Sequence, residues 1–572
     1  MVIPSPYPPL DIPQTDLLSY LFPRGVTPSS DPVWLDAANP ENCLSPKQGI
    51  NWIKRLAIGL DRMKIPAQEP VMILTPNHIF VPVAYLGIVG SKRIFSAANP
   101  IYIVSELVHQ LRNTGARLML VHPTLLKTAL EAAEACNLPR SRVFQFSDRP
   151  NPPLYGVPDW RELIGSPEEA DAYHWTPMTG TEPARTVATV NYSSGTTGLP
   201  KGVCVSHQNL VANAEQHIFM KFVGSGYTLD NRPKERYVGF LPLYHAYGQL
   251  WASILCIKLS VPMYIMEKFN YEEFLRCIQT YRITSLQAAP PILIMLSKRP
   301  ETSKYDISSV THILCGAAPL KKELQNDITK RFGIRVTQGW GMTEVTCGAM
   351  LVPFHADDDS GSVGPLNPNT ECKLLDEDGK VVGPGEPGEI FVRGPQVCLG
   401  YWKNEVATKD ALGSDGWLKT GDVAVMDKRG WFWIVDRRKE LIKVNALQVA
   451  PAELESVLLE NDDIADACVV GITLYATFEK FLCLQLLTAS RHNEEWPRAY
   501  VVLKDHAKGN VSDTHIHAWM KPKVAKHKQL VGGIMFIDEV PKLASGKIVR
   551  KLIKEWAKRD AKEMEGKVKA RL

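Results

Sequence analysis

Short runs of apolar and β-branched residues alternate with helix-patterned segments through the first three quarters of the chain. The runs are VMILTP (71–76), LMLVHP (118–123), ITSLQAAP (283–290) and THILCGAAP (311–319). Each ends in proline, glycine or small residues, and stretches such as SELVHQLRNTGA (105–116) separate them, which predicts an α/β fold of layered, mostly parallel sheets with helices. Ligands of such sheets bind beyond the carboxyl ends of the strands, where the small-residue runs fall.

The pattern changes after Asp422, where AVMDKRGWFWIVDRRKELIKV (424–444) predicts two strands around a tight turn near 428–430. PAELESVLLE (451–460) then predicts an amphipathic helix that begins at a proline. A chain of 572 residues is too long for one hydrophobic core. We therefore predict a large domain over 1–436 and a small, mobile α+β domain over 437–572 that ends in a helix.

Charge and cysteine content narrow the class of protein. The 65 basic and 61 acidic side chains leave a net charge of +4, which requires neither a nucleic acid nor an anionic membrane as partner. The 11 cysteines are scattered without a CxxC pair, which indicates reduced, intracellular thiols. The most apolar stretch, 250–266, is interrupted by Lys258 and Pro262, so we expect a helix followed by a strand there, and no transmembrane span.

The loop YSSGTTGLPKGV (192–203) has the composition of an anion site, since backbone N–H groups and a lysine can surround a phosphate. It is not a Walker A loop, because only two residues separate Gly195 and Gly198 and Lys201 is followed by glycine. The loop follows TVATV (186–190) and precedes a helical segment with Ser206 as its N-cap, which predicts a strand–loop–helix unit. A flexible linker, the alternative, would gain nothing from this placement.

The loop resembles the phosphate-binding signature of the adenylate-forming enzymes, the superfamily of acyl-CoA synthetases, luciferases and peptide-synthetase adenylation domains. Other motifs resemble that superfamily in the same order: GFLPLYHAYG (239–248), GAAPLKKEL (316–324), QGWGMTE (338–344), WLKTGD (417–422), DRRKELIKVNALQVAPAELE (436–455) and PKLASGKIVRK (541–551). The resemblance spans Tyr192 to Lys551 and is closest to 4-coumarate:CoA ligases and their peroxisomal relatives.

This resemblance implies a two-step acid:CoA ligase that uses ATP, Mg²⁺ and CoA, first forming an acyl-adenylate and then a thioester. The acid is expected to be aryl, like cinnamate or phenylacetate, or of medium length. Three alternatives stay open: an adenylate-forming enzyme that does not use CoA, a fatty acyl-CoA synthetase, and a catalytically silent nucleotide sensor.

The resemblance also assigns the nucleotide site. The expected ATP and AMP ligands are Ser193, Ser194, Gly195, Thr196, Thr197, Gly198, Lys201, Gln338, Gly339, Trp340, Gly341, Met342, Thr343, Asp422, Arg437, Lys439, Lys443 and Lys547. Trp340 stands where the family usually has tyrosine and is expected to stack on adenine, while Asp422 accepts from the ribose hydroxyls. Glu344 is the expected magnesium ligand. Catalysis is assigned to Lys547, His245 and Thr343; a lysine in this Lys-rich tail would otherwise be read as solvated charge.

The acyl and CoA sites follow from the same resemblance. The expected acyl-pocket residues are His245, Tyr247, Trp251, Gly316, Ala317, Gly339, Gly341 and Cys347, and Trp251 is expected to shorten the pocket. Lys268 is expected to contact CoA, as are Asn445 and Ala446, which replace the Lys-Gly pair of relatives.

Two terminal features carry expectations of their own. The last residues, Ala570-Arg571-Leu572, are of the small-basic-Leu type, from which we expect a peroxisomal import receptor as partner and a peroxisomal location, and otherwise a cytoplasmic one. The apolar segment 478–495 is either an additional buried helix or a gene-model error.

Overall fold

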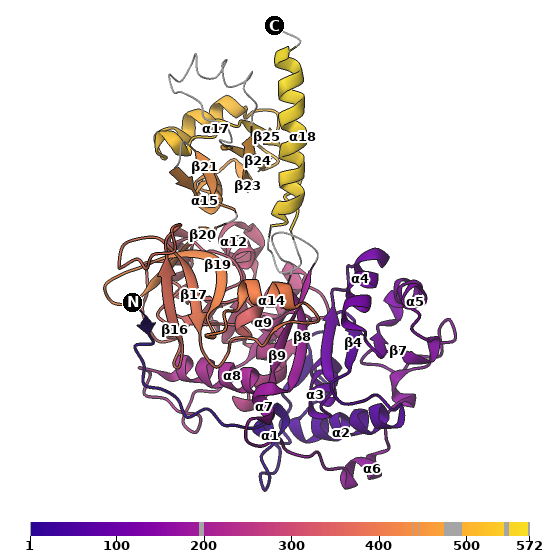
Figure 1. Cartoon of the computed structure of the whole chain (residues 1–572). Coiled ribbons are helices and arrows are strands. Elements are labelled where there is room, and N and C mark those ends of the chain that lie inside the picture. Colours follow the sequence, from indigo (N-terminus) through magenta and orange to yellow (C-terminus); the bar gives the residue numbers. More distant parts are fainter. Residues whose placement is uncertain are drawn as a thin grey trace.

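The computed structural model describes residues 2–193, 200–438, 440–444, 447–473, 495–542 and 548–569, with side chains for all of these except 443, 447, 448 and 565–569 (Figure 1).

Two large, mostly parallel sheets contain the apolar runs of the sequence, as predicted (Figure 1). The first has the order β15 (Met350–Leu351), β14 (Arg335–Trp340), β13 (His312–Cys315), β12 (Ser285–Ala288), β10 (Tyr237–Gly239), β11 (Met263–Ile265), β2 (Trp34–Asp36) and β3 (Cys43–Leu44). The second has the order β18 (Gly400–Tyr401), β9 (Lys201–Ser206), β8 (Val187–Ser193), β5 (Ile94–Ala98), β4 (Pro70–Leu74), β6 (Leu118–Val121) and β7 (Val143–Gln145).

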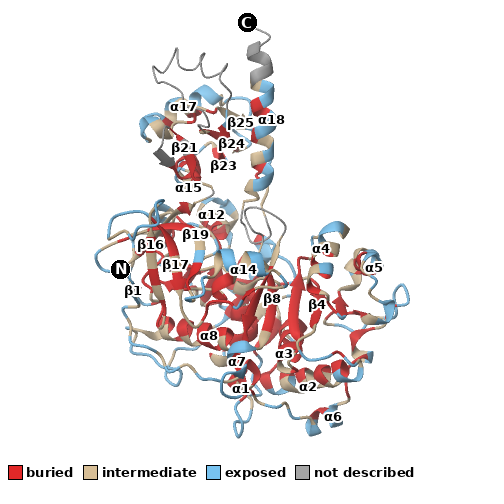
Figure 2. Ribbon diagram, viewed as in Figure 1, coloured by how far each residue is buried: buried red, intermediate tan, exposed pale blue. Residues whose placement is uncertain are grey.

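The main hydrophobic core joins these sheets through α3 (Phe80–Gly90), α8 (His207–Phe222) and the π-helical turn η4 (Leu250–Leu255). Figure 2 shows that the buried residues concentrate in the strands of the sheets and in the helices packed on them, such as α3 and α8. The other α-helices before the C-terminal region are α1 (Leu17–Leu21), α2 (Pro46–Arg62), α4 (Val104–Thr114), α5 (Leu126–Ala135), α6 (Pro167–Ala172), α7 (Glu182–Arg185), α9 (Ala246–Gln249), α10 (Cys256–Lys258), α11 (Tyr271–Tyr281), α12 (Pro290–Lys298), α13 (Lys322–Phe332) and α14 (Glu405–Ala411).

The segment after the glycine-rich loop differs from the predicted strand–loop–helix unit. Lys201–Ser206 form a strand, β9, which pairs antiparallel with β8 so that Ser193 lies opposite Lys201. Every residue of this strand after Lys201 is buried, and Val203 and Val205 completely so, as is typical of an apolar, β-branched strand inside a sheet. Ser206 caps α8 as predicted, because its hydroxyl accepts from the N–H of Asn209.

A third sheet is antiparallel and contains the predicted hairpin. Its strands are β1 (Ile3–Pro4), β16 (Glu371–Leu375), β17 (Gly388–Arg393), β19 (Leu418–Met426) and β20 (Phe432–Arg437). The carboxylate of Asp427 accepts from the N–H groups of Arg429 and Trp431 at 2.9 Å each, which closes the predicted turn. The resulting register places Asp422 directly opposite Arg437.

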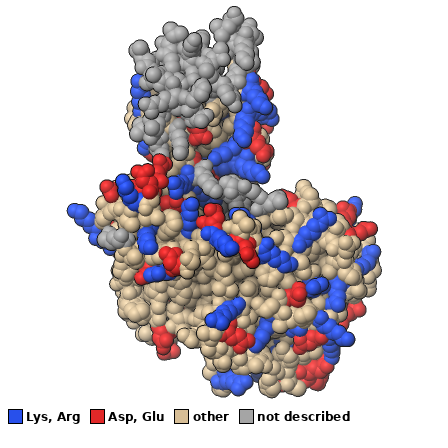
Figure 3. Space-filling model, in the orientation of Figure 1, with Lys and Arg blue, Asp and Glu red and all other residues tan. Residues whose placement is uncertain are grey.

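The C-terminal region has a hydrophobic cluster of its own, which extends from Ile442 to Ala561. Its elements are β21 (Ile442–Val444), β22 (Leu447–Val449), α15 (Pro451–Leu459), β23 (Ile464–Thr473), β24 (Glu495–Leu503), α17 (Asp513–Met520), β25 (Ile534–Phe536) and α18 (Arg550–Lys569). These elements sit above the large sheets in Figure 1, and Lys and Arg gather along α18 in Figure 3. The domain boundary at 436 remains a prediction.

Two further expectations concern the apolar stretch and the cysteines. Residues 250–266 form η4, α10 and then β11, so the predicted helix followed by a strand is confirmed. Across the part of the chain that the structure describes, no helix is long and apolar enough to cross a bilayer. The ten cysteines within the described ranges are free thiols.

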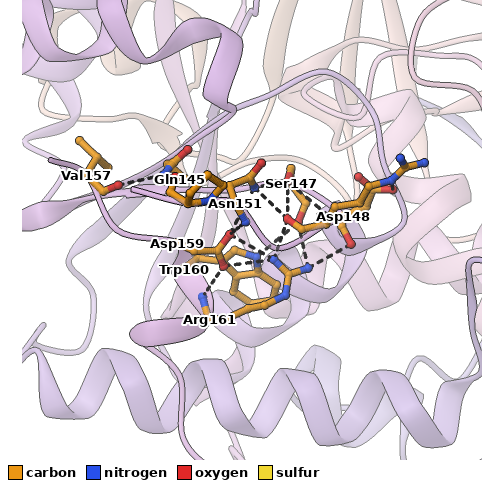
Figure 4. Close-up of polar contacts among 10 residues, drawn as sticks. Gln145, Ser147, Asp148, Asn151, Val157, Asp159, Trp160 and Arg161 are labelled. Carbon is orange, nitrogen blue, oxygen red and sulfur yellow. Dashed lines mark hydrogen bonds and ion pairs between the residues drawn. The ribbon is translucent and has the colours of Figure 1, made fainter. Parts of the chain in front are cut away.

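A cluster of polar side chains holds the loop that follows β7 in place through hydrogen bonds (Figure 4). The Asp159 carboxylate accepts from the backbone N–H of Asn151 at 2.9 Å and from Arg161 Nη1 at 3.1 Å. The amide of Gln145 donates to the carbonyl of Val157 at 2.8 Å. Because these groups satisfy one another, the sheet edge at β7 ends in an ordered loop.

A buried ion pair joins β24 to α18 and leads to a prediction about stability. Asp560 accepts from Arg498 Nη2 at 2.8 Å and from the hydroxyl of Tyr500 at 2.7 Å, and its residue is 2% exposed. We expect Asp560→Ala to lower the free energy of opening of this region by about 3–5 kcal/mol, because it leaves a buried guanidinium unpaired. Hydrogen exchange of the β23–β24 amides measures this opening separately from the rest of the chain.

Asp505→Ala is the matched control for this prediction. Its carboxylate pairs with Lys508 at 2.7 Å but is 97% exposed, so its loss should leave the exchange of the β23–β24 amides essentially unchanged. Equal effects of the two substitutions would contradict the proposed importance of the buried pair.

Candidate active site

One cavity of about 1290 Å³ lies at the carboxyl ends of β13 and β14 and extends to the β19–β20 hairpin. It brings together many of the predicted site residues, which come from segments far apart in the chain. Those that line it are Ser193, Lys201, His245, Tyr247, Gly316, Ala317, Gly339, Trp340, Gly341, Met342, Thr343, Glu344, Cys347 and Arg437.

One cluster of polar side chains in this cavity, the Glu344 group, is centred on Glu344. This residue lies in the short 3-10 helix η6 (Thr343–Val345) and is buried. Its Oε1 accepts from the hydroxyl of Tyr401 at 2.9 Å. The ammonium of Lys201 lies 5.1 Å from the centroid of the same tyrosine ring. Burial and the adjacent Glu344 carboxylate raise the pKa of Tyr401, so its hydroxyl keeps the proton that it donates.

A second cluster of polar side chains, the Asp422 group, is centred on Asp422 of β19. The indole N–H of Trp340 donates to its Oδ2 at 2.9 Å, and Arg437 Nε lies 3.3 Å from its Oδ1. Asp422 itself is not among the cavity-lining residues, although Trp340 and Arg437 both are. A carboxylate held through both oxygens has a fixed orientation, which suits the recognition of a vicinal diol.

The other end of the cavity is apolar and close-packed. Tyr247 donates its hydroxyl to the carbonyl of Leu314 at 3.0 Å, so its ring forms a wall. A Cβ at Gly341 would overlap the carbonyl of Cys347, which explains the glycine at that position. Burial raises the pKa of the Cys347 thiol to about 12, so this thiol is neutral at pH 7.

Three predicted site residues lie elsewhere. Trp251 is 2% exposed, and its ring packs 5.5 Å from that of Tyr237 in the core; the burial of so large an apolar ring explains why it does not line the cavity. Gln338 donates to the carbonyl of Leu320 and to Gln325 behind the cavity wall. Lys268 is exposed and is absent from the lining. The predicted shortening of the pocket by Trp251 therefore has no support in this geometry.

Several predicted residues fall outside the described ranges: 194–198, Lys439, Asn445, Ala446, Lys547 and 570–572. Most of the segment 478–495 lies there too, and Lys443 lies in β21 without a described side chain. Their roles, including the expected peroxisomal address, stay predictions.

Sequence reasoning missed Tyr401 and His217, which also line the cavity. Tyr401 lies in LGYWKN, where no local pattern indicates that it will meet Glu344. His217 lies on α8 among apolar residues, a context in which a histidine usually belongs to the core.

Comparison with known proteins places this chain in a family. The pattern of the AMP-binding enzyme family matches residues 49–402. The chain belongs to the AMP-binding enzymes. It is 34% identical over 537 residues to the acyl-CoA synthetase ACTT5 of Alternaria alternata, covering 93% of this chain and 88% of that protein. It is also 34% identical to a probable 4-coumarate–CoA ligase 1 of Dictyostelium discoideum, covering 88% of each chain.

A solved structure shares the fold of this AMP-binding enzyme. The anthranilate CoA ligase AuaEII in complex with anthranoyl-AMP superimposes with a TM-score of 0.81 at 22% identity, covering 96% of this chain and 99% of that one. The predicted fold class and the resemblance to adenylate-forming enzymes are confirmed. By family and by its relatives, the chain is an AMP-forming acid–thiol ligase.

Proposed function

We propose that this AMP-binding enzyme joins a compact aryl or medium-length carboxylic acid to CoA at the expense of ATP. The observation that carries the proposal is the continuity of the cavity, which connects the polar groups around Glu344 and Asp422 with the apolar end at Tyr247. An acid bound at the apolar end would present its carboxylate to a nucleotide bound at the polar end. The resemblance to 4-coumarate–CoA ligases supports an aryl acid.

The reaction has two steps. A carboxylate oxygen attacks the α-phosphorus of ATP, the bond to the bridging oxygen breaks, and pyrophosphate leaves. The sulfur of CoA then attacks the acyl carbon, loses its proton to solvent and displaces AMP. Lys201 would neutralise departing phosphate charge, and Asp422 would hold the ribose, so that the reacting atoms are positioned before charge develops.

Magnesium fits the Glu344 group. Mg²⁺ takes one or two protein carboxylates and completes its shell with phosphate oxygens and water. Glu344 supplies one buried carboxylate, and among the described side chains only Tyr401 donates to it, at Oε1. The described residues contain no group of three or more His, Cys, Asp or Glu arranged to hold an ion, which argues against an all-protein cage in that part of the chain. Bound there, Mg²⁺ would neutralise phosphate charge.

Tyr401 provides a test of this assignment. Tyr401→Phe removes the hydroxyl that orients Glu344 and should raise the Mg²⁺ concentration for half-maximal AMP formation about 10-fold, as loss of outer-shell hydrogen bonds does elsewhere. Titration of Mg²⁺ at saturating ATP measures this effect. Tyr155→Phe, at an exposed tyrosine far along the chain from this cluster, is the control. An unchanged Mg²⁺ requirement in Tyr401→Phe would argue against Glu344 as the ligand.

We also propose that the C-terminal region rotates about 436–438 between the two steps, because the position needed by Lys547 in adenylation must later admit a thiol. Among the described residues, the contacts across this segment include a small apolar cluster of Val423, Val435, Leu441 and Ala450, together with polar contacts. Arg438 N–H donates to the carbonyl of Gly421 at 2.9 Å, and its side chain pairs with Glu389 at 2.5 Å. Lys298 Nζ donates to the carbonyl of Leu459 at 2.8 Å.

The test is a panel of carboxylic acids assayed for pyrophosphate exchange and AMP release, with and without CoA. We expect exchange without CoA and steady AMP release only with CoA. Turnover independent of CoA would favour an oxygenase or a carrier-loading enzyme. The absence of exchange with every acid would favour a silent nucleotide sensor.

A further inference from the structure

His217 of α8 is an unused hydrogen-bonding group in the apolar end of the cavity. It is 5% exposed, yet it lines the cavity. Its Nδ1 lies 2.8 Å from the backbone carbonyl of Asn213. A carbonyl can only accept, so Nδ1 must carry the proton. No polar atom of the described residues bonds the other ring nitrogen, Nε2.

The imidazole is neutral, so Nε2 presents a lone pair. Burial lowers the pKa of His217 to about 4, although the hydrogen bond to Asn213 opposes that shift. At pH 7 the ring therefore donates through Nδ1 and can only accept through Nε2. Because His217 lines the cavity and Nε2 has no donor among the described residues, this nitrogen can accept a hydrogen bond from whatever occupies the cavity.

Gly348 keeps this nitrogen uncovered. A Cβ at position 348 would lie 3.1 Å from Nε2 and 3.0 Å from Cε1 of His217, so any larger residue would press on that edge of the ring. The side chain of Asn213 holds the glycine in place, since its Nδ2 donates to the carbonyl of Gly348 at 2.7 Å and its Oδ1 accepts from the Gly348 N–H at 3.3 Å. Asn213, His217 and Gly348 form a rigid corner.

The charges of the cavity exclude an anion at this corner. Among the described residues, the Lys and Arg side chains that line the cavity are Lys201, Lys419, Arg437 and Arg438, from the segments around the nucleotide end. The apolar end contributes the neutral Cys347 thiol and the engaged hydroxyl of Tyr247. A second carboxylate there would be buried without a counter-charge and would face a lone pair.

We propose that His217 selects acids that carry a neutral hydrogen-bond donor, a hydroxyl or an amino group, at the end opposite the carboxylate. This inference rests on the proposed acid:CoA ligase function and names the substrate class. The donor would give its hydrogen to Nε2, and Gly348 would leave room for it.

Matched acids test the proposal in the full-length enzyme. The probes are 4-hydroxycinnamate, 4-aminocinnamate, 4-methoxycinnamate, cinnamate and 4-carboxycinnamate, each assayed for AMP release with CoA. We expect kcat/KM to be about 10-fold higher for the hydroxy or amino acid than for cinnamate or the methoxy acid, and lowest for the dicarboxylic acid. AMP release with cinnamate reports the ligase function itself, so the two proposals can fail separately.

Variants of the corner complete the experiment. His217→Leu should lose the preference for donor-bearing acids while still using cinnamate, and His217→Gln, which retains an acceptor, should recover part of it. Gly348→Ala should also lose the preference, although the histidine remains. Three results would each overturn the inference. The first is an equal loss of kcat/KM with all acids in His217→Leu. The others are no preference for donor-bearing acids in the wild-type enzyme, and a preference for the dicarboxylic acid.

Discussion

Replacement of Lys547 by alanine should slow acyl-adenylate formation on the order of 100-fold or more. The motif resemblance assigns this ammonium to the negative charge that would develop when the carboxylate attacks the α-phosphorus, and a methyl group could not neutralise that charge. Thioester formation from a supplied acyl-adenylate should largely survive, because the proposed rotation withdraws the lysine before that step. Single-turnover measurement of each half-reaction separates the two effects.

The described residues on either side of the Lys547 motif favour a folded variant. Lys542, before the loop, pairs with Asp466 at 2.6 Å, and Arg550, after it, pairs with Glu440 at 2.7 Å. Both ends are therefore anchored without Lys547. Lys558→Ala, at an exposed position of α18, is the control for loss of one positive charge. Equal slowing of both half-reactions by Lys547→Ala would make the assignment wrong.

Asp422→Asn should lower kcat/KM for ATP roughly 100-fold, because hydrogen bonds from ribose hydroxyls to a carboxylate contribute about 1.5–3 kcal/mol each. The substitution also leaves Arg437 without its partner and places an amide against the indole N–H of Trp340. The effect should appear mainly in KM for ATP, whereas KM for the acid should change little.

Discrimination between ATP and 2′,3′-dideoxy-ATP shows whether the ribose is the cause. The wild-type enzyme should prefer ATP strongly, and Asp422→Asn should prefer it much less. Asp427→Asn, at the turn of the same hairpin, is the matched control, because asparagine can also accept from the N–H groups of Arg429 and Trp431. If Asp422→Asn kept the full preference for ATP, the carboxylate would not contact the ribose.

The two polar groups of the site show where prediction from sequence stops. Asp422 and Arg437 were both assigned to the nucleotide, and the hairpin predicted between them fixes their register, so their contact follows from local pattern. The residues that orient the Glu344 and Asp422 carboxylates could not be predicted from local sequence pattern. Trp340 is 82 residues from Asp422, and Tyr401 is 57 residues from Glu344. Trp340 was predicted to stack on adenine, but its hydrogen bond to Asp422 was not foreseen.

Which residues line the acyl end of the cavity depended still more on tertiary packing. Trp251 was placed in the pocket by the family resemblance, but its ring is buried in the main hydrophobic core. His217 was taken as part of a helix, and only the approach of Gly348 from 131 residues further along the chain leaves its Nε2 facing the cavity. Side-chain direction at such positions is set by which neighbours fill the space around them, and those neighbours come from distant segments.

The sequence by itself determined the alternation of strands and helices, the cap at Ser206, the turn at 428–430 and the family motifs, because these depend on residues within a few positions of one another. Tertiary structure determined that 201–206 form β9 and how the Glu344 and Asp422 carboxylates are oriented. It also determined that Trp251 lies outside the cavity and that Nε2 of His217 has no protein donor among the described residues. The physical reason is that hydrogen-bond partners and buried neighbours are chosen in space, and the topology of the three sheets brings them together only after the chain has folded.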